Sequence, residues 1–256
     1  MCTLVILRRP EHRWPVIIGA NRDEMIGRPA APPARHWPDR PEVVAGRDLL
    51  AGGSWLGIND WGVTAAVLNR HGSLGPAPGQ RSRGELVLEA LDHPDAVAAA
   101  EALSHLDPAA YRTFNLIVAD NRDAFWLRHA DGAHIEMQPI PDGLSLIDSG
   151  ELNRPNNRRV VLAAPRFRLA KPPDPDLDDW AEWQALLSEG ESPPGELPET
   201  ALRFRMPHGY GTVSSALIAL PEPNAGERKP RFRYAQWQPT VTPWTDVADR
   251  LRSSPQ

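Results

Sequence analysis

The chain has 256 residues, of which 41% are hydrophobic and 24% are charged. These proportions are ordinary for a folded globular protein, and they argue against both a disordered chain and a membrane protein. A formal net charge of -5 leaves no concentrated basic surface, which argues against a nucleic-acid partner.

Two short apolar runs near the start predict a β-hairpin, because both are β-branched and prolines stand at each end of the segment between them. The runs are residues 3–7 and 16–18. The second run continues directly into a polar group, residues 21–24. In an antiparallel pair the end of one strand lies beside the start of the other, so we expect this group next to Cys2.

The later segments alternate between strands and helices. A second hairpin is predicted over 52–58 and 62–69, followed by helices over 82–91 and 95–105. Hairpins outnumber βαβ units in this order, which favours an α+β fold with antiparallel sheets over a doubly wound parallel sheet. The remaining expected elements are strands at 115–119, 124–128, 134–137, 144–147, 212–220 and 231–237, and helices at 156–162 and 177–187.

Domain organisation follows from length and from proline. We interpret residues 1–256 as one domain, with a peripheral tail from about residue 239 that includes a short helix over 244–251. Prolines gather in stretches that we interpret as rigid surface loops, with residues 28–41 as the longest. No apolar run approaches the roughly 18 residues that span a bilayer, and no leader pattern precedes residue 10, so a cytoplasmic location is expected.

Cys2 is the only cysteine, which excludes an internal disulfide and a thiolate zinc site. Removal of Met1 would make Cys2 the first residue, so that the thiol and the free α-amino group belong to the same residue. Such an amine has an ordinary pKa of about 7.7 to 8.0, so it can act as a general base toward the thiol. From position alone, the alternative is a buried structural cysteine at the start of a strand.

The polar group that follows the second strand offers side chains that suit such a nucleophile. Arg22 near a thiol would lower the pKa of the thiol, and either carboxylate of the group, Asp23 or Glu24, could orient and charge-balance an α-ammonium group. The same cluster can also form a solvated turn held by salt bridges. On the residues alone both interpretations stay open.

The segment Met1-Cys2-Thr3, followed by Gly-Ala-Asn-Arg-Asp-Glu at residues 19–24, resembles the start of the NRDE family, also called the transport-and-Golgi-organisation-2 family. The resemblance extends well beyond this motif. Further segments look like family signatures and follow the family's order over most of the chain. They are residues 53–59, 65–69, 82–84, 92–94, 114–120, 210–212 and 214–215.

The same N-terminal pattern is similar to that of the choloylglycine hydrolase and penicillin acylase group of N-terminal nucleophile hydrolases. This resemblance implies a four-layer αββα sandwich with antiparallel sheets, in which Cys2 attacks a linear amide. It implies further that the amine of Cys2 is the base and that Asp23 is the partner of that amine. Asn21 and Arg22 would then position the amine or stabilise charge.

Three positions depart from the pattern that the resemblance implies. Ala20 stands near the place of an expected arginine, which leaves Arg22 as the cation expected there. Ser149 replaces an amide expected to help form the oxyanion hole, although its hydroxyl can still donate one hydrogen bond. Val213 replaces a second expected arginine.

Three residues in the middle of the chain are candidates for substrate binding. Asn69 and His71 lie at the margin of a predicted strand, where a cleft can form, and Trp55 would offer a flat ring to a planar ligand. The structural alternative places Trp55 in the core. The eight histidines show no spacing suited to a zinc site, so we expect no metal.

The sequence therefore supports three functions. The first is an amidohydrolase that cleaves a linear C–N bond through Cys2. The resemblance implies a second, a non-catalytic trafficking protein that binds haem, a lipid or acyl-CoA, with haem as a carried ligand and not as a required cofactor. The third is a structural or interaction protein with an inert Cys2. The first two have a small molecule as their partner, and all three leave the oligomeric state open.

Overall fold

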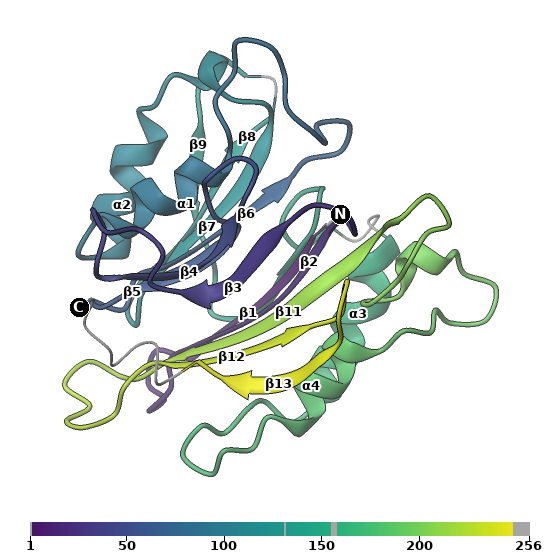
Figure 1. Cartoon of the computed structure of the whole chain (residues 1–256). Helices are drawn as coiled ribbons and strands as arrows, with labels where there is room; N and C mark the ends of the chain where they lie inside the picture. The colour runs from purple at the N-terminus through teal and green to yellow at the C-terminus, as the bar shows by residue number, and fades with distance from the viewer. Residues whose placement is uncertain (1, 131, 155–157, 248–256) are drawn as a thin grey trace. The chain divides into compact units, whose positions relative to one another are not determined.

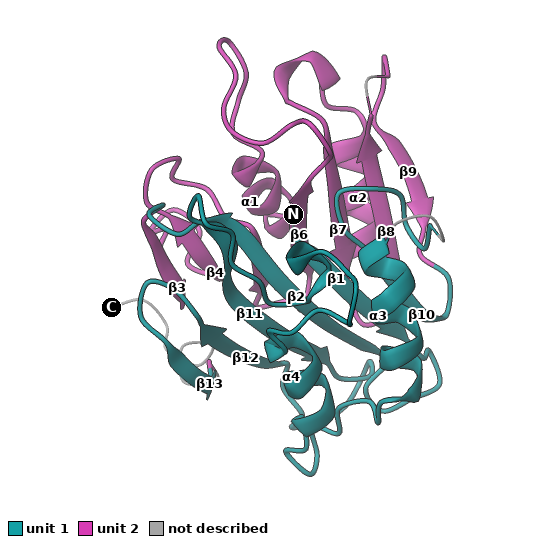
Figure 2. Cartoon of the chain, turned by 90° about the vertical axis from the view of Figure 1, so that its right-hand side faces the viewer, with its two compact units in different colours: residues 1–28, 141–246 teal, residues 29–140, 247–256 magenta. Residues whose placement is uncertain are grey.

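The computed structural model describes residues 2–130, 132–154 and 158–247. The chain divides into two compact units, which Figure 2 shows in different colours. The first unit consists of Met1–Arg28 and Pro141–Asp246, and the second of Pro29–Ile140 and Val247–Gln256. The first unit is thus formed by two segments of the chain, one before and one after residues 29–140. The interpretation of the whole chain as one domain stays a prediction.

The first unit is built on a six-stranded antiparallel sheet with the order β10-β1-β2-β11-β12-β13. The predicted N-terminal hairpin is confirmed as β1 and β2, and the predicted last strand pair as β11 and β12 (Figure 1). The strands are β1 (Thr3–Arg8), β2 (Val16–Met25), β10 (Gly143–Ile147), β11 (Tyr210–Leu220), β12 (Arg231–Gln236) and β13 (Thr242–Asp246).

Helices α3 (Arg158–Leu169) and α4 (Ala181–Ser188) pack on this sheet, and the short 3-10 helix η2 (Pro198–Thr200) contacts α3. Phe167 of α3 and the fully buried Trp183 of α4 meet edge to face, with their ring centroids 5.1 Å apart. Burying an aromatic side chain of this size stabilises the fold by about 1.5–3 kcal/mol. Helix α3 contacts the edge strand β10, and α4 contacts the central strands β2 and β11.

The predicted helices of this unit differ from the observed ones at their ends. The expected helix at 177–187 begins only at Ala181, because Asp174 and Asp179 pair across a turn in which Asp178 has a positive φ of 53°. The expected helix at 156–162 corresponds to α3, which continues to Leu169. Its first two expected residues lie outside the described part of the chain.

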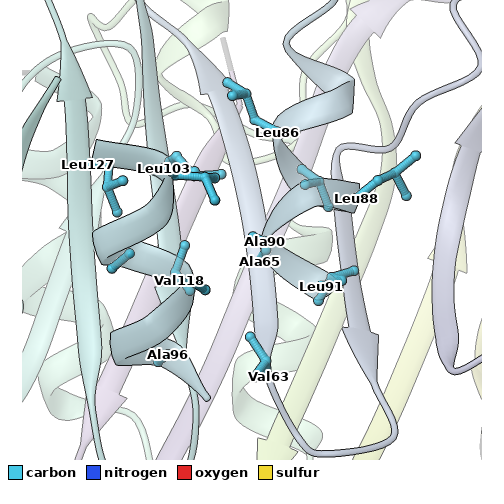
Figure 3. Close-up of a cluster of buried hydrophobic side chains, with 14 of the residues drawn as sticks. Val63, Ala65, Leu86, Leu88, Ala90, Leu91, Ala96, Leu103, Val118 and Leu127 are labelled. Atoms are coloured by element: carbon cyan, nitrogen blue, oxygen red, sulfur yellow. The ribbon is translucent and has the colours of Figure 1, made fainter. Parts of the chain in front are cut away.

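The second unit is a seven-stranded antiparallel sheet whose strands follow one another in sequence order. Helices α1 (Gly84–Leu91) and α2 (Ala96–Ser104) cover it, as predicted, and Asp95 caps α2 by accepting from the backbone N of Ala98 at 2.8 Å. Figure 3 shows their apolar side chains over the strands. The remaining elements are β3 (Ala30–Ala34), β4 (Val43–Asp48), β5 (Leu56–Asn59), β6 (Thr64–Asn69), β7 (Phe114–Ala119), β8 (Ala124–His129), β9 (Glu136–Pro139) and the 3-10 helix η1 (Pro108–Ala110).

The proline-rich stretch 28–41 is not only loop, as the sequence suggested. Residues Ala30–Ala34 form β3 at the edge of the second sheet, although two of the five are prolines. Proline has no N–H to donate, and an edge strand tolerates it because one side of the strand needs no ladder partner. The register shifts between Ala31 and Ala34, around these prolines. Strand β4, which pairs with β3, was also missed.

The predicted tail helix over 244–251 is wrong where the structure describes it. Trp244 lies in β13, which pairs with β12 through Arg233 opposite Asp246 and Tyr234 opposite Thr245. Residues 248–251 lie outside the described part. The strand is mostly exposed at the edge of its sheet, and the peripheral tail stays a prediction. Among the described residues, no helix has the length and apolar character needed to cross a membrane.

Candidate functional site

The pairing of β1 with β2 brings Cys2 to the polar group at the end of β2. Thr3 lies opposite Asn21 in this antiparallel pair, so the residue before Thr3 reaches Arg22 and Asp23. The backbone N of Asp23 donates to the Cys2 Sγ at 3.4 Å, and the thiol lies 3.8 Å from the carbonyl oxygen of Asp23. The spatial neighbourhood predicted from the hairpin is therefore present.

The carboxylate of Asp23 is buried and occupied on both oxygens. Its Oδ2 accepts from Nη1 of Arg159 at 2.8 Å, and its Oδ1 accepts from the hydroxyl of Thr212 at 2.7 Å. The side chain of Asp23 is 0% exposed and that of Arg159 is 3% exposed. A buried carboxylate needs such partners, because an isolated ion is strongly disfavoured away from water.

Arg159, which enters the site from the first turn of α3, is the functional residue that sequence reasoning missed. Its Nη1 also donates to Oγ1 of Thr3 at 2.8 Å, and its Nε donates to the carbonyl of Glu199 at 3.0 Å. Its guanidinium lies 4.8 Å from the ring centroid of Phe204. Arg159 supplies a cation that contacts the Asp23 carboxylate, and the expected role of Arg22 beside the thiol stays a prediction.

A signal for Arg159 was present in the sequence. Arg159 and Val160 share the buried face of α3 with Ala163 and Phe167, at helical spacing. An arginine on the apolar face of an amphipathic helix needs a buried acceptor, and it therefore points to a buried carboxylate or carbonyl elsewhere in the fold. Its neighbour Arg158 instead pairs with Glu196 at the surface.

Asn21 uses both atoms of its side-chain amide in buried hydrogen bonds. Its Nδ2 donates to the carbonyl oxygens of Leu187 at 3.0 Å and Leu202 at 2.6 Å. Its Oδ1 accepts from the hydroxyl of Ser215 at 2.5 Å. These bonds link β2 to the end of α4, to the segment after η2 and to β11, so the geometry favours a positioning role for Asn21.

We therefore expect Asn21→Ala to lower the free energy of unfolding by about 1–3 kcal/mol, because two buried carbonyl groups would lose their donor. Urea unfolding followed by tryptophan fluorescence measures this loss. An Asn21→Ala protein that unfolds at the same urea concentration as the unmodified protein would show that these bonds add nothing to stability.

Strand β1 pairs with β2 on one side and with β10 on the other, and Arg22 of β2 and Ser149, just after β10, are nearest to Cys2 when the register is continued. Arg22 is buried on β2, opposite Ser214 of β11. The side chains of Arg22 and Asp23 lie on opposite faces of the sheet, because consecutive side chains of a strand alternate between its two faces. On the other side, β10 ends with Ile147 opposite Leu4, and the same register continued by two residues brings the buried Ser149 beside Cys2.

The loop after β10 is held by its own polar side chains. Asp148 accepts from the backbone N of Gly150 at 2.8 Å. Asn153, with a positive φ of 56°, donates from its amide to Ser145 at 3.0 Å and accepts from the backbone N of Leu146 at 2.9 Å. These bonds fold the loop back on β10, and they fix where Ser149 leaves the sheet.

Strand β11 closes the site at a β-bulge. Its register shifts between Thr212 and Ser214, so Val213 is the extra residue, and Val213 is buried where the family resemblance implied an arginine. Bulges re-aim side chains beside a strand. The hydroxyl of Thr212 points to the carboxylate of Asp23, and the hydroxyl of Tyr210 donates to the carbonyl of Asp23 at 3.3 Å.

Burial raises the pKa of the Cys2 thiol above its ordinary value, and the negative charge of Asp23 raises it further, while Arg22 acts weakly in the opposite direction. Burial, with the charges of Cys2 and Asp23, also raises the pKa of Tyr210. Both groups therefore hold their protons at neutral pH. A Cys2 nucleophile in this site must pass its proton to a nearby base when it attacks, because few thiolates form in advance.

We expect iodoacetamide to alkylate Cys2 slowly at neutral pH in protein that retains Met1. The raised pKa keeps the thiol protonated, so the rate should still rise above about pH 9, where a free cysteine is already mostly thiolate. The measurement is the rate of mass increase at a series of pH values, with glutathione as the reference thiol. Alkylation as fast as that of glutathione at pH 7 would contradict the electrostatic account.

The three predicted substrate-binding residues all belong to the second unit. Trp55 is half-buried before β5, and its indole fills the space over Gly46, where a Cβ would overlap the ring. Asn69 ends β6 opposite Phe114, and His71 is exposed in the turn that follows. Their role in substrate binding stays a prediction. In the described ranges, no group of three histidine, cysteine, aspartate or glutamate side chains is placed to hold a metal ion.

The fold defined by these elements is that of the N-terminal nucleophile hydrolases. The chain is similar to an N-acylethanolamine-hydrolyzing acid amidase ortholog from Caenorhabditis elegans, with a TM-score of 0.56 and 12% identity over 88% of this chain and 96% of that one. It is also similar to a conjugated bile acid hydrolase from Clostridium perfringens, with a TM-score of 0.55 and 12% identity over 97% and 93%. Identity this low shows a shared fold and no more.

Residues 1–157 match the family described as Transport and Golgi organisation 2, and the chain belongs to that family. A homologue from Mus musculus is 35% identical over 120 residues, which are 43% of this chain and 40% of the mouse protein. A homologue from Bos taurus is 38% identical over 120 residues, which are again 43% of this chain and 40% of the bovine protein. The match thus spans less than half the length of these relatives. The family segment includes Cys2, Asp23 and Ser149 and ends before Arg159.

Proposed function

We propose that this protein is an amidohydrolase in which Cys2, freed by removal of Met1, attacks the carbonyl carbon of a linear amide. The observation that carries the proposal is the contact of Cys2 with Asp23, whose buried carboxylate is held by Arg159 and Thr212. This arrangement lies at the start of β1, where an α-amino group on residue 2 would stand beside the thiol.

The reaction proceeds in two halves. In the first, the thiol proton moves to the α-amine, the sulfur bonds to the amide carbon, and the negative charge collects on the carbonyl oxygen. The C–N bond then breaks, and the leaving amine takes the proton from the α-ammonium, which leaves a thioester on Cys2. In the second half, water attacks the thioester, the amine again relays the proton, and a carboxylic acid leaves with the thiol restored.

Three neighbouring groups support this chemistry. Asp23 offers a fixed negative charge that orients the α-amine and stabilises it while it carries the proton. Continuing the register of β10 past Ile147 would bring Ser149 opposite Cys2, where its hydroxyl could donate to the developing oxyanion. Tyr210, which keeps its proton, bonds the same carbonyl of Asp23 that lies near the thiol, and its hydroxyl would have to turn from that carbonyl to donate to the oxyanion.

The structural relatives favour an N-acyl amide as the substrate class. One is named for hydrolysing N-acylethanolamines and the other for hydrolysing conjugated bile acids. Both names describe the cleavage of an amide that joins a carboxylic acid to a small amine. The test is to incubate protein shown by intact mass to lack Met1 with a panel of N-acylethanolamines and glycine-conjugated bile acids. Release of the free amine and acid is expected, and no release from any of them would overturn the proposal for this substrate class.

The alternative is a non-catalytic protein that carries haem, a lipid or acyl-CoA. A titration with haem separates the two functions, because a carrier would shift the Soret absorption at micromolar haem whether or not Cys2 is replaced. An amidohydrolase would lose its turnover when Cys2 is replaced by alanine. Haem as a carried ligand and a cytoplasmic location both stay predictions.

A further inference from the structure

Arg159 connects three separate parts of the site through one guanidinium group. A single nitrogen, Nη1, donates to both Thr3 Oγ1 and Asp23 Oδ2 at 2.8 Å. The Nε bonds the carbonyl of Glu199, and the ring of Phe204 lies against the guanidinium plane. These contacts come from β1, β2 and the segment around η2. The cation is therefore fixed in place, and it is buried with the carboxylate that it meets.

The same contacts hold the first residues of β1 against Asp23. Cys2 accepts from the backbone N of Asp23 at 3.4 Å, and Thr3 shares the guanidinium nitrogen that binds the Asp23 carboxylate. An α-amino group on Cys2 branches from the same Cα as the anchored thiol, one residue before the contact of Thr3 with Arg159. Its protonation must therefore respond to the net charge of Asp23 and Arg159, because charges this close and this buried are weakly screened.

We propose that Arg159 is a positioning residue that offsets the charge of Asp23, so that the α-amino group of Cys2 remains an unprotonated base in the neutral range. The proposal rests on the proposed function, because it needs Cys2 as the first residue. With Arg159 present, both carboxylate oxygens have partners and the pair is close to neutral. Without Arg159, the negative charge of Asp23 would no longer be offset by this cation and would favour the protonated amine, which cannot accept the proton of the thiol.

The other charged groups around Cys2 set the direction of this effect. Strand β2 contributes Arg22 as well as Asp23, and the loop after β10 contributes the buried Asp148. Strand β11 contributes Tyr210, which stays protonated and neutral. The two carboxylates favour the ammonium form and the two arginines oppose it. Removing Arg159 from α3 therefore tips the balance toward the ammonium form.

The single cysteine makes the amine directly observable. Protein labelled with 15N-cysteine and lacking Met1 carries one labelled nitrogen, and its chemical shift reports protonation of the α-amine as the pH is varied. We expect Arg159→Met to raise the apparent pKa of this amine by about one unit or more, since an opposite charge at contact distance shifts a pKa by about 1–3 units. Arg159→Lys, which keeps a cation, should restore most of the unmodified midpoint.

Arg158→Met is the matched control, because it removes the same charge from the neighbouring residue, whose side chain is 58% exposed and pairs with Glu196. Its midpoint should equal that of the unmodified protein. Equal midpoints for Arg159→Met and the unmodified protein would overturn the proposal. The titration needs no substrate, so a protein that hydrolyses nothing can still show the Arg159 effect, and an active enzyme can still fail to show it.

A second comparison keeps the test decisive if Arg159→Met alone does not fold. The double variant Asp23→Asn, Arg159→Met removes both charges together and keeps an acceptor for Thr212, so neither charge is left buried without its partner. If Arg159 offsets Asp23, the amine of the double variant should titrate close to that of the unmodified protein. A midpoint displaced by about one unit or more would equally overturn the proposal.

Discussion

Replacing Cys2 with alanine should lower the rate of amide hydrolysis by about 10³-fold or more, because the variant has no atom that can form the thioester. Cys2→Ser should retain a small part of the activity, since a hydroxyl at the same position can still pass its proton to the α-amine but is a weaker nucleophile there. The measurement is the initial rate of amine release from the best N-acyl amide of the panel, with protein whose Met1 has been removed.

A chain with an intact Cys2 but a blocked amine is the control for this prediction. An uncleaved N-terminal extension turns the α-amine of Cys2 into a peptide N–H, which cannot accept a proton. This form should be as inactive as Cys2→Ala, although its thiol is unchanged. An extended chain with full activity would show that the amine is not the base, and an active Cys2→Ala protein would dismiss the nucleophile itself.

Breaking the pair of Asp23 and Arg159 from one side should cost about 3–5 kcal/mol of the free energy of unfolding. Both side chains are almost fully buried, so Arg159→Met leaves a carboxylate and Asp23→Asn leaves a guanidinium without a counter-charge. The double variant should lose much less than the two single losses combined, because neither charge is then left alone. Denaturant unfolding of the four proteins gives the coupling free energy.

Arg158→Met again provides the comparison. Its partner Glu196 forms an ion pair with a half-exposed arginine, and exposed pairs of this kind contribute about 0.2–1 kcal/mol. A loss at Arg159 no larger than the loss at Arg158, or losses at Asp23 and Arg159 that simply add, would contradict a tightly coupled buried pair.

The local part of the site was predictable from the sequence because it depends on one hairpin. Cys2 and Asp23 are 21 residues apart. Two short apolar runs on either side of a proline-bounded turn predict a hairpin, and antiparallel pairing then sets these two residues side by side. The two antiparallel sheets and the α+β fold followed from the same kind of short-range pattern. The family resemblance then implied the N-terminal nucleophile fold, which the structural relatives confirm.

The partners of Asp23 were out of reach because they come from distant parts of the chain. Arg159 is 136 residues away and Thr212 is 189 residues away, and no local pattern sets which buried acceptor an arginine will meet. The same holds for Asn21, whose three partners lie 166 to 194 residues further along. A motif of adjacent polar residues gives no sign that one of them faces the active centre and another faces the core.

Edge strands were the weakest part of the fold prediction. Strand β3 has two prolines in five residues, so its composition indicates a loop, and only its pairing with β4 makes it a strand. Strand β13 likewise has Pro243 and mostly exposed side chains, which hide the alternation that identifies buried strands. In both places tertiary pairing outweighs local propensity.

The central claim is that Cys2 carries the acyl group during hydrolysis, and the most direct test is mass spectrometry of the protein quenched with acid during turnover of an N-acyl amide. We expect the peptide beginning at Cys2 to gain the mass of the acyl group, and neutral hydroxylamine to remove it, as for a thioester. Steady hydrolysis with an unmodified Cys2 peptide in which no acyl group accumulates, together with full activity of Cys2→Ala, would contradict it.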